Sequence, residues 1–262
     1  MEALDRDERR AEYQPIVGTA TGRLVGVEAL LRWVHPSQGV IGPGTVIPMA
    51  EQAGLIGAFG HWVLRQACLD RPRWPAESGS YLLDLAVNVS AVQLMDAGYV
   101  SSIENVMTST GTTPATVTLE VTESVFIQDS NRALAVLHDL KDLGVMLALD
   151  DFGTGYSSLS YLKKFPVDIV KIDQVFIGDL TIDPTSRLIV SAVVSLAHFL
   201  DMQVVAEGVE TAEQRAEVLA LECDYFQGFL TSQPLPPDRL SLFMDEVSRG
   251  RELRQPALGE AV

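Results

Sequence analysis

Short apolar strands alternate with helical stretches along almost the whole chain, and this alternation limits the folds open to it. The residue pattern predicts strands at Leu24–Leu31, Leu82–Val89, Val117–Val121, Val145–Leu149, Val167–Ile172 and Gln203–Ala206, with a shorter one near Tyr225–Phe226. Helices are predicted at His61–Arg71, Tyr99–Thr110, Asn131–Leu143, Thr185–Leu200, Thr211–Leu221 and Pro237–Ser248. Such alternation over 262 residues is typical of an α/β protein with a mostly parallel sheet and suits a (β/α)₈ barrel. An open doubly wound sheet is the alternative, although no glycine-rich dinucleotide or Walker motif follows any predicted strand.

The predicted strands carry polar or charged residues at or near their carboxyl ends. These residues are Glu28, Asn88, Glu120, Asp150, Asp151, Lys171, Asp173, Glu207 and Gln227. The carboxyl ends of the strands of a parallel barrel meet at one mouth, where side chains distant in sequence come together. A single charge at a strand end usually marks only the boundary with solvent. Repetition on every predicted strand instead predicts a functional site at the mouth.

Two adjacent carboxylates, Asp150 and Asp151, follow the apolar run that ends at residue 149. Neighbouring side chains of a strand normally point to opposite faces. Gly153 and Gly155 permit a sharp turn just beyond the pair, which would let both carboxylates face one point. Their mutual repulsion at that point requires a cation. An Asp-Asp pair without the other acids would instead indicate a solvated turn.

The residue types at the strand ends indicate the kind of cation. Carboxylates and an amide oxygen, without thiolate or imidazole, suit Mg²⁺, Mn²⁺ or Ca²⁺ rather than structural zinc. The four histidines form no HExxH pair and none lies at a strand end, so we interpret them as surface or helix-packing residues. Lys171 is interpreted as a structural counter-ion, as a residue that orients a metal-bound water, or as both.

Composition excludes some classes of function. The net charge of −16 argues against non-specific binding to DNA or RNA, but it permits a phosphate substrate if metal ions or a few arginines reverse the local field. Cys68 and Cys223 are far apart and form no CxxC motif, which favours a reducing compartment. No apolar run is long enough to span a membrane, and the charged start lacks the apolar core of a secretion signal. We therefore expect a soluble, cytoplasmic protein.

An ordered series of motifs resembles the EAL domain family, bacterial phosphodiesterases that act on cyclic di-GMP. The series comprises Tyr13-Gln14-Pro15, Glu28-Ala29-Leu30-Leu31-Arg32-Trp33, Asn88-Val89-Ser90, Leu119-Glu120-Val121-Thr122-Glu123-Ser124, Asp150-Asp151-Phe152-Gly153-Thr154-Gly155, Lys171-Ile172-Asp173, Ala206-Glu207-Gly208-Val209-Glu210, Gln227-Gly228-Phe229 and Ser232-Gln233-Pro234-Leu235-Pro236. One tripeptide carries no weight, but the whole series is specific and covers nearly the entire chain. The resemblance implies a modified (β/α)₈ barrel in which one strand runs antiparallel to the others.

The resemblance also implies a role for each motif residue. Glu28, Asn88, Glu120 and Asp150 match the ligands of one metal ion, and Asp150, Asp151 and Glu207 match those of a second. Glu207 matches either a metal ligand or a general base, and Lys171 matches the residue that contacts the attacking water. Substrate binding is assigned to Gln14, Leu31, Arg32, Asp173 and Gln227, and support of the loop after Asp151 to Glu123 and Glu210. Glu123 lies three residues after Glu120, so in an extended segment the two side chains face opposite sides, which leaves Glu123 a supporting role.

The activity implied by the resemblance is hydrolysis of cyclic di-GMP to linear pGpG by a signalling domain that degrades a second messenger. Two divalent ions, Mg²⁺ or Mn²⁺, are expected to support turnover, whereas Ca²⁺ is expected to inhibit it because its longer bonds disturb in-line displacement. Expected domains are a charged leader or linker end at residues 1–12, a barrel at 13–250 and a loose tail at 251–262. A homodimer and an upstream sensor or GGDEF domain are the expected partners.

Three rival interpretations follow from the same residues. In the first, the chain is a receptor that binds cyclic di-GMP without cutting it. In the second, it is a protein-interaction module with vestigial acids. In the third, it is another metal-dependent phosphohydrolase on the same barrel. Receptors of this kind are expected to lack metal ligands or the lysine, and all of those positions are filled here. The complete set therefore favours the enzyme.

Overall fold

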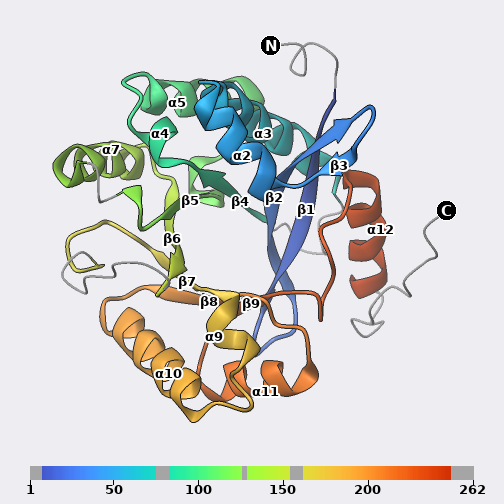
Figure 1. Ribbon diagram of the computed structural model, residues 1–262, viewed down its shortest axis with the longest axis vertical. Helices are drawn as coiled ribbons and strands as arrows, with labels where there is room; N and C mark the ends of the chain where they lie inside the picture. Colours follow the sequence, from blue (N-terminus) through green and yellow to red (C-terminus); the bar gives the residue numbers. More distant parts are fainter. Residues whose placement is uncertain (1–7, 75–82, 126–128, 154–161, 249–262) are drawn as a thin grey trace.

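A computed structural model describes residues 8–74, 83–125, 129–153 and 162–248 (Figure 1). Within these ranges, eight strands close a barrel: β1 (Arg9–Gly18), β2 (Leu24–His35), β4 (Asp84–Val89), β5 (Val117–Thr122), β6 (Met146–Phe152), β7 (Ile169–Ile172), β8 (Gln203–Ala206) and β9 (Tyr225–Gln227). The order around the barrel is β1-β9-β8-β7-β6-β5-β4-β2, and pairing of β1 with β2 closes it. β1 is antiparallel to both of its neighbours, whereas the remaining barrel pairs are parallel. The expected modified (β/α)₈ barrel with one antiparallel strand is confirmed, and β3 (Gly39–Ile41) extends β2 outside it.

Helices surround the barrel. They are α2 (Pro43–Gln52), α3 (Ile56–Asp70), α4 (Ala91–Leu94), α5 (Tyr99–Thr110), α7 (Ser130–Asp142), α9 (Gln174–Gly178), α10 (Pro184–Phe199), α11 (Ala212–Ala220) and α12 (Pro237–Ser248), with short 3₁₀ turns at Arg71–Arg73 and Pro114–Thr116. In Figure 1, α2, α3, α4 and α5 lie together on one side of the barrel, and α10 and α11 lie on the other. Among the described helices, none combines the length and the apolar character needed to cross a membrane.

Local sequence explains where several helices begin. Asp183 accepts hydrogen bonds from the backbone N–H groups of Thr185 and Ser186, and Pro184 occupies the first position of α10, where a missing N–H costs nothing. Thr211 and Gln214 form a reciprocal capping box at the start of α11. These caps therefore fix the first residues of both helices.

The predicted elements agree with the structure along most of the chain. The bounds of α5, α12 and β8 match the prediction residue for residue, and β4–β7 and β9 each lie within three residues of it. The predicted helix at His61–Arg71 begins five residues too late, because α3 starts at Ile56. The structure also adds β1, β3, α2, α4 and α9, which the sequence pattern did not indicate.

The strand β1 overlaps the charged leader that the sequence suggested for residues 1–12. Arg9 to Glu12 belong to β1 and pair with β2, from Arg9 opposite Trp33 to Glu12 opposite Leu30. The barrel therefore begins before residue 13. The strand alternates buried and partly exposed residues, so its polar residues face outward or toward the mouth while Ala11, Tyr13 and Val17 are buried. The tail expected at 251–262 lies outside the described residues.

Candidate active site

Lys171 lies at the centre of the barrel mouth, surrounded by carboxylates. Its ammonium nitrogen is 2.7 Å from Glu207, 2.9 Å from Glu120, 3.2 Å from Asp150 and 3.6 Å from Glu28. The side chain of Lys171 is 2% exposed, and that of Glu120 is equally buried. Four strands, β2, β5, β6 and β7, and the residue that follows β8 each supply one of these five charged groups. The sequence-predicted convergence of the strand ends therefore occurs in the structure.

Strand register explains this convergence. Asn88 pairs with Glu120 across β4 and β5, so both side chains stand at the same height in the barrel. The parallel part of β2 covers Gly26 to Ala29 and contains Glu28, whereas the residues beyond Ala29 pair only with β1 and β3. Glu28 thus lies near the carboxyl end of the part of β2 that pairs with β4, although β2 itself continues to His35.

Asp150 and Asp151 approach each other through a backbone distortion in β6. Asp151 has a φ of 54°, a left-handed conformation that aspartate tolerates better than most residues, and the pairing of β6 with β7 shifts register across it. The backbone N–H of Asp151 donates to Oδ1 of Asp150 at 3.0 Å. The sequence predicts that the glycines after the pair bring the two carboxylates together, but the reversal takes place at Asp151 itself. Gly153, with a φ of 98°, continues the turn, and Gly155 lies outside the described residues.

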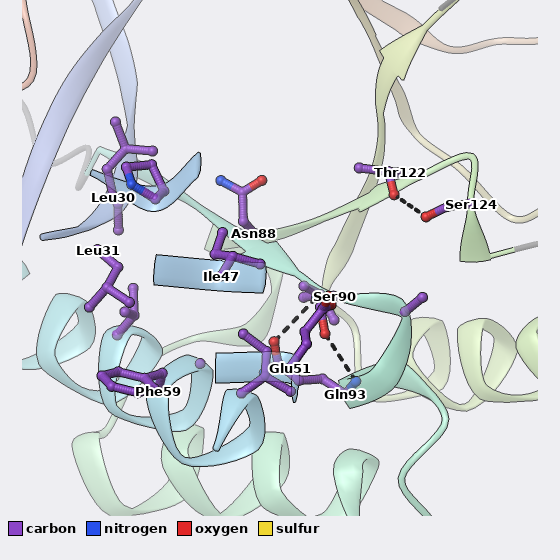
Figure 2. A pocket seen from close by; sticks show the side chains of 17 residues that line it. Leu30, Leu31, Ile47, Glu51, Phe59, Asn88, Ser90, Gln93, Thr122 and Ser124 are labelled. Atoms are coloured by element: carbon purple, nitrogen blue, oxygen red, sulfur yellow. Dashed lines mark hydrogen bonds between the residues drawn. The ribbon is translucent and has the colours of Figure 1, made fainter. Parts of the chain in front are cut away.

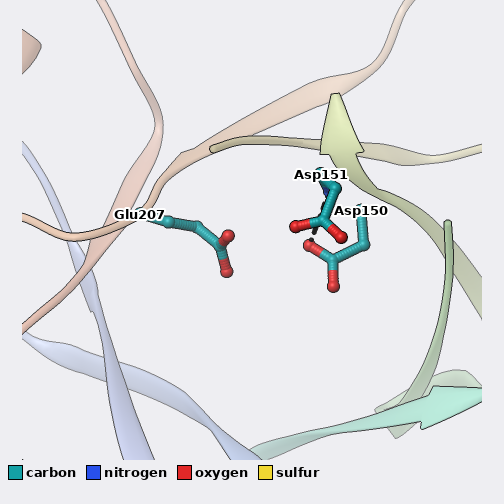
Figure 3. A group of neighbouring side chains, drawn as sticks. All are labelled: Asp150, Asp151 and Glu207. Carbon is teal, nitrogen blue, oxygen red and sulfur yellow. Dashed lines mark hydrogen bonds between the residues drawn. The ribbon is translucent and has the colours of Figure 1, made fainter. Parts of the chain in front are cut away.

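Asp150, Asp151 and Glu207 form a three-carboxylate cluster. One oxygen atom of each lies within 4.8 Å of the others. Figure 3 shows Glu207 extending from one side of the barrel mouth toward the two aspartates on the other. Carboxylate oxygens at this spacing can bind one divalent ion between them.

The charges in the mouth are unbalanced. Burial raises the pKa of Glu120 well above its ordinary value and that of Glu207 to about 8, with neighbouring acids adding to both shifts and Lys171 opposing them. Partial burial and the adjacent Asp150 raise the pKa of Asp151 to about 6. Burial alone would lower the pKa of Lys171, but the surrounding acids raise it well above its ordinary value. Five acids thus share one ammonium group, and further positive charge would stabilise their ionised forms.

Three amide side chains connect Glu28 to the wall of the mouth. The amide of Asn88 donates to Oε1 of Glu28 at 2.5 Å, and that of Gln227 donates to Oε2 at 2.6 Å. Gln227 also donates to Oε1 of Gln14 at 2.9 Å. Oε1 of Gln227 is buried and has no hydrogen-bond partner among the described residues. These contacts fix the Glu28 carboxylate and leave polar amide atoms along the wall.

Arg32 is the basic residue that lines the mouth beside these amides. Its Nε donates to Oε2 of Glu12 at 2.8 Å, and its Nη1 donates to the carbonyl of Leu31 at 3.2 Å. The side chain of Arg32 is 14% exposed and that of Glu12 is 24% exposed. Glu12 therefore orients the guanidinium group, which remains within reach of an anion in the cavity.

The mouth opens into a cavity of about 860 Å³. The lining residues are Gln14, Glu28, Leu30, Arg32, Val40, Gly42, Pro43, Gly44, Ile47, Asn88, Asp150, Asp151, Lys171, Asp173, Gln174, Glu207, Gly208, Glu210, Gln227, Gly228, Phe229 and Pro234. Most of the sequence-predicted site residues are among them. The lining residues from β3 and α2 were not predicted, because they belong to none of the motifs. Phe229 and Pro234, after β9, belong to motifs but were given no role.

Leu31 occupies a different place from the one expected of a substrate-binding residue. Leu31 is buried and lines a cavity of about 210 Å³ between β2, β4 and helices α2 and α3, but not the large cavity, whereas Leu30 lines both (Figure 2). That smaller cavity is mostly apolar. Figure 2 shows the hydrogen-bonded pairs Ser90–Gln93 and Thr122–Ser124 at its polar side.

The two residues expected to support loops make contacts of different kinds. Oε1 of Glu123 accepts a hydrogen bond from the backbone N–H of Gly153 at 3.3 Å, two residues after Asp151. The backbone N–H of Glu210 donates to Oε1 of Gln214 at 2.8 Å, and Glu210 also lines the cavity. Asp173 lines the cavity as well, and its carboxylate caps α9 by accepting from the N–H of Val175 at 2.7 Å.

The donor set fits divalent ions. Every candidate ligand offers oxygen: the carboxylates of Glu28, Glu120, Asp150, Asp151 and Glu207 and the amide of Asn88. Hard cations such as Mg²⁺ and Mn²⁺ prefer oxygen ligands, and the excess of negative charge favours their binding. The structural chemistry of the mouth therefore supports a divalent-metal centre.

Comparisons with known proteins place this site in context. A family model described as the EAL domain matches residues 1–234. The chain is 44% identical over 239 residues to MucR of Pseudomonas aeruginosa, named a bifunctional diguanylate cyclase/cyclic di-GMP phosphodiesterase, with 91% of this chain and 35% of that protein covered. It is 40% identical over 243 residues to the cyclic di-GMP phosphodiesterase NbdA of the same organism, with 93% of this chain and 31% of NbdA covered.

The chain also resembles a solved structure. The MucR phosphodiesterase in complex with c-di-GMP superposes with a TM-score of 0.86 at 44% identity and covers 91% of this chain and 96% of that one. The chain spans about a third of the length of the two curated relatives. It corresponds to one region of those larger proteins.

Proposed function

The chain belongs to the EAL domain family, and we propose that it is a metal-dependent phosphodiesterase that hydrolyses cyclic di-GMP to linear pGpG. The observation that carries this proposal is the complete set of acids around Lys171 at the mouth of a cavity of about 860 Å³. The similarity to a phosphodiesterase solved with c-di-GMP supports the choice of substrate.

The acids divide into two ligand groups. Glu28, Asn88, Glu120 and Asp150 would hold one divalent ion, and Asp150, Asp151 and Glu207 would hold the other. When bound, two such ions lower the pKa of a shared water and stabilise the attacking and leaving oxygens of an in-line displacement. We propose Mg²⁺ or Mn²⁺ as the active ions, with Ca²⁺ inhibitory.

Lys171 would orient the nucleophile. Its ammonium group is fully buried, donates to Glu120 and Glu207, and lies at the base of the cavity where the phosphodiester would approach. An ammonium held in this position can donate a hydrogen bond to water or hydroxide and stabilise its negative charge. The surrounding acids keep Lys171 protonated, so it acts as a donor rather than as a base.

Arg32 and the amides would bind the substrate. The guanidinium group of Arg32, held by Glu12, offers charge-assisted hydrogen bonds to a phosphate oxygen. Gln14, Gln227 and Asp173 line the same cavity and supply polar contacts, and Leu30, Val40, Pro43 and Phe229 supply apolar surface. Together they would hold a ligand with charged phosphates and flat apolar parts.

Glu207 has two compatible roles, metal ligand and general base. We assign it to the metal, because its carboxylate lies with Asp150 and Asp151 in one cluster. The substitution Glu207→Gln separates the roles, since glutamine keeps a ligand oxygen but cannot accept the proton. If this variant binds two Mn²⁺ ions as the wild type does yet has lost turnover, Glu207 acts as the base.

The decisive experiment is incubation of the purified chain with cyclic di-GMP and Mg²⁺ or Mn²⁺, with separation of substrate and products by liquid chromatography. We expect pGpG to form, and we expect excess chelator or the substitution Asp150→Ala to stop its formation. Binding of cyclic di-GMP without cleavage would support the receptor interpretation instead. Cleavage of other phosphodiesters in preference to cyclic di-GMP would support a different phosphohydrolase.

Partners and location complete the proposal. MucR is named as a protein with diguanylate cyclase and phosphodiesterase activities, and we propose that this chain likewise acts beside an upstream sensor or GGDEF domain. We also propose that it forms a homodimer in the cytoplasm, and analytical ultracentrifugation of the purified chain would test the dimer.

A further inference from the structure

The short helix α9 packs against Gly153, two residues after Asp151, and against Gly208, which directly follows Glu207. It follows directly after Lys171, Ile172 and Asp173, and Asp173 caps it. Asp151 lies near the end of β6, and Glu207 directly follows β8. These two residues come from different strand ends but belong to the same carboxylate cluster. Whatever fixes the distance between the two strand ends therefore also shapes the proposed second metal site.

On the Asp151 side, the ring of Phe176 rests against Gly153. A Cβ atom built on Gly153 would lie 2.8 Å from Cε2 and 3.1 Å from Cζ of that ring, so the contact uses all the space that glycine leaves. Gly153 follows Asp151 by two residues and has a φ of 98°. Phe176 is partly buried and packs against the core, which fixes its ring. Phe176 therefore limits how far the turn after Asp151 can move toward α9.

On the Glu207 side, Gln174 rests against Gly208 in the same way. A Cβ atom on Gly208 would lie 2.4 Å from Cβ and 3.1 Å from Cα of Gln174, so the two backbones are in close contact. Gly208 has a φ of 69° and directly follows Glu207. The N–H of Glu207 also donates to the carbonyl of Ile172 at 3.0 Å. The position of Glu207 thus depends on the start of α9.

Gln214 connects the end of α9 to the same loop. Its amide nitrogen donates to the carbonyls of Ile177 at 3.2 Å and Gly178 at 3.4 Å. Its oxygen accepts from the N–H groups of Glu210 at 2.8 Å and Thr211 at 3.0 Å. The side chain is buried, at 7% exposure. One amide therefore joins the last turn of α9 to the segment that follows Glu207.

From these contacts we propose that α9 is the spacer of the second metal site, and that Phe176 and Gln214 are positioning residues that set the separation of Asp151 from Glu207. The proposal rests on the proposed function for its metal ions, but neither residue touches metal or substrate in it. Glu28, Asn88 and Glu120, which would hold the other ion together with Asp150, lie on β2, β4 and β5, and the contacts of α9 with Gly153 and Gly208 do not involve these strands. Loosening α9 should therefore weaken one ion selectively.

The test is a titration of the metal-free chain with Mn²⁺, followed by electron paramagnetic resonance and without substrate. We expect two ions to bind the wild type, and we expect Phe176→Leu and Gln214→Leu each to weaken one of them about tenfold or more while the other is unchanged. If the two residues act through one rigid helix, the double variant should lose less affinity than the two single losses combined. In turnover assays, both single variants should need a higher Mn²⁺ concentration than the wild type for half-maximal rate, with little change in the KM for cyclic di-GMP.

Two matched controls separate positioning from general stability. Val175→Ala alters an exposed side chain on α9 itself, and Asp183→Ala removes the cap of the neighbouring helix α10. Both should bind two Mn²⁺ ions as the wild type does, even where thermal denaturation shows lower stability. If Gln214→Leu does not fold, Phe176→Leu tests the proposal alone.

The outcomes distinguish this proposal from the proposed function. Unchanged affinity for both ions in folded Phe176→Leu and Gln214→Leu, or a single ion bound by the wild type, overturns the role of α9. A wild type that binds two ions but leaves cyclic di-GMP intact contradicts the proposed phosphodiesterase, and the Mn²⁺ titration still decides the role of α9.

Discussion

The ammonium of Lys171 lies 2.9 Å from a carboxylate oxygen of Glu120, and each side chain is only 2% exposed. Each group would be costly to bury alone. The ammonium opposes the rise that burial causes in the pKa of Glu120, and Glu120 and the other acids raise the pKa of Lys171. Three further acids lie within 4 Å of the same nitrogen, so the single lysine leaves the site with an excess of negative charge. The stability of the fold and the activity of the site therefore both depend on how this excess of negative charge is neutralised.

Removal of the Lys171 charge should destabilise the fold. Without metal, Lys171→Met should lower the free energy of unfolding by about 3–5 kcal/mol, because it leaves buried acids without a counter-ion. Urea denaturation in excess chelator measures this. Lys141→Met is the control, since Lys141 pairs with Asp168 at side-chain exposures of 27% and 24% and its loss should cost about 1 kcal/mol or less. Equal losses in the two variants would show that Lys171 is not the counter-ion of the site.

Divalent ions should stabilise the chain and activate it. Mn²⁺ at about a hundred times its dissociation constant should add about 2.7 kcal/mol to the free energy of unfolding, since the ligands come together only in the folded state. Thermal denaturation with and without Mn²⁺ measures this, and Asp150→Ala should show a much smaller rise because Asp150 would serve both ions. Mg²⁺ and Mn²⁺ should support turnover, while added Ca²⁺ should reduce it. Full turnover in excess chelator would contradict the metal centre.

The parallel strands could be predicted from sequence because each is a short apolar run with a polar end. β8 was predicted to the residue, and the acids at the strand ends identified the mouth. β1 could not be predicted, because its start is charged and its burial depends on pairing with β2 and with β9, the second of which is distant in sequence. α2 could not be predicted either, because Gly44 and the internal Pro48 argue against a helix.

Spacing predicted which polar residues meet but not the finer geometry that joins them. The left-handed conformation at Asp151 has no signal in the sequence, since aspartate adopts it only where its surroundings require it. The direction of the Leu31 side chain depends on the register of β2, because a shift of one residue turns every side chain of a strand to the opposite face. The contacts of Gln214 with α9 join segments more than 30 residues apart, and no local pattern indicates them.

Arg32 should be sensitive even to replacement by lysine. Arg32→Lys keeps the charge but loses the fork geometry that Glu12 holds through Nε. We expect the KM for cyclic di-GMP to rise about tenfold, with a smaller change in kcat, because the group binds phosphate and does not take part in proton transfer. Steady-state kinetics measures both parameters. Arg187→Lys, in an exposed ion pair with Glu217 on the outer helices, is the control and should leave KM unchanged.

Stability should fall at alkaline pH. Burial, assisted by Asp224, raises the pKa of the Cys223 thiol from 9.0 to about 12, and burial followed by Asp70 raises the pKa of Tyr13 above its ordinary value. Both groups keep their protons in the folded state while the unfolded chain releases them, so the free energy of unfolding decreases as pH rises above about 9. Below about pH 9, the contribution of these two groups to the free energy of unfolding is fully present. Urea denaturation between pH 7 and pH 11 measures the slope, and Cys223→Ala should reduce it. A slope that is the same in the variant would mean that Cys223 ionises alike in both states.

Glu123 should matter for turnover although it need not touch metal or substrate. Its Oε1 accepts the N–H of Gly153, two residues after Asp151, so loss of the carboxylate should let Asp151 shift. A ligand displaced by about 1 Å can cost on the order of a hundredfold in rate, and we expect Glu123→Ala to lose about ten- to a hundredfold in kcat at saturating Mn²⁺. Glu123→Gln keeps an oxygen that can accept the same N–H and should recover most of the rate, which a role of the negative charge itself would not allow. Wild-type turnover in a folded Glu123→Ala chain would show that Glu123 is only a partly exposed acid after a strand.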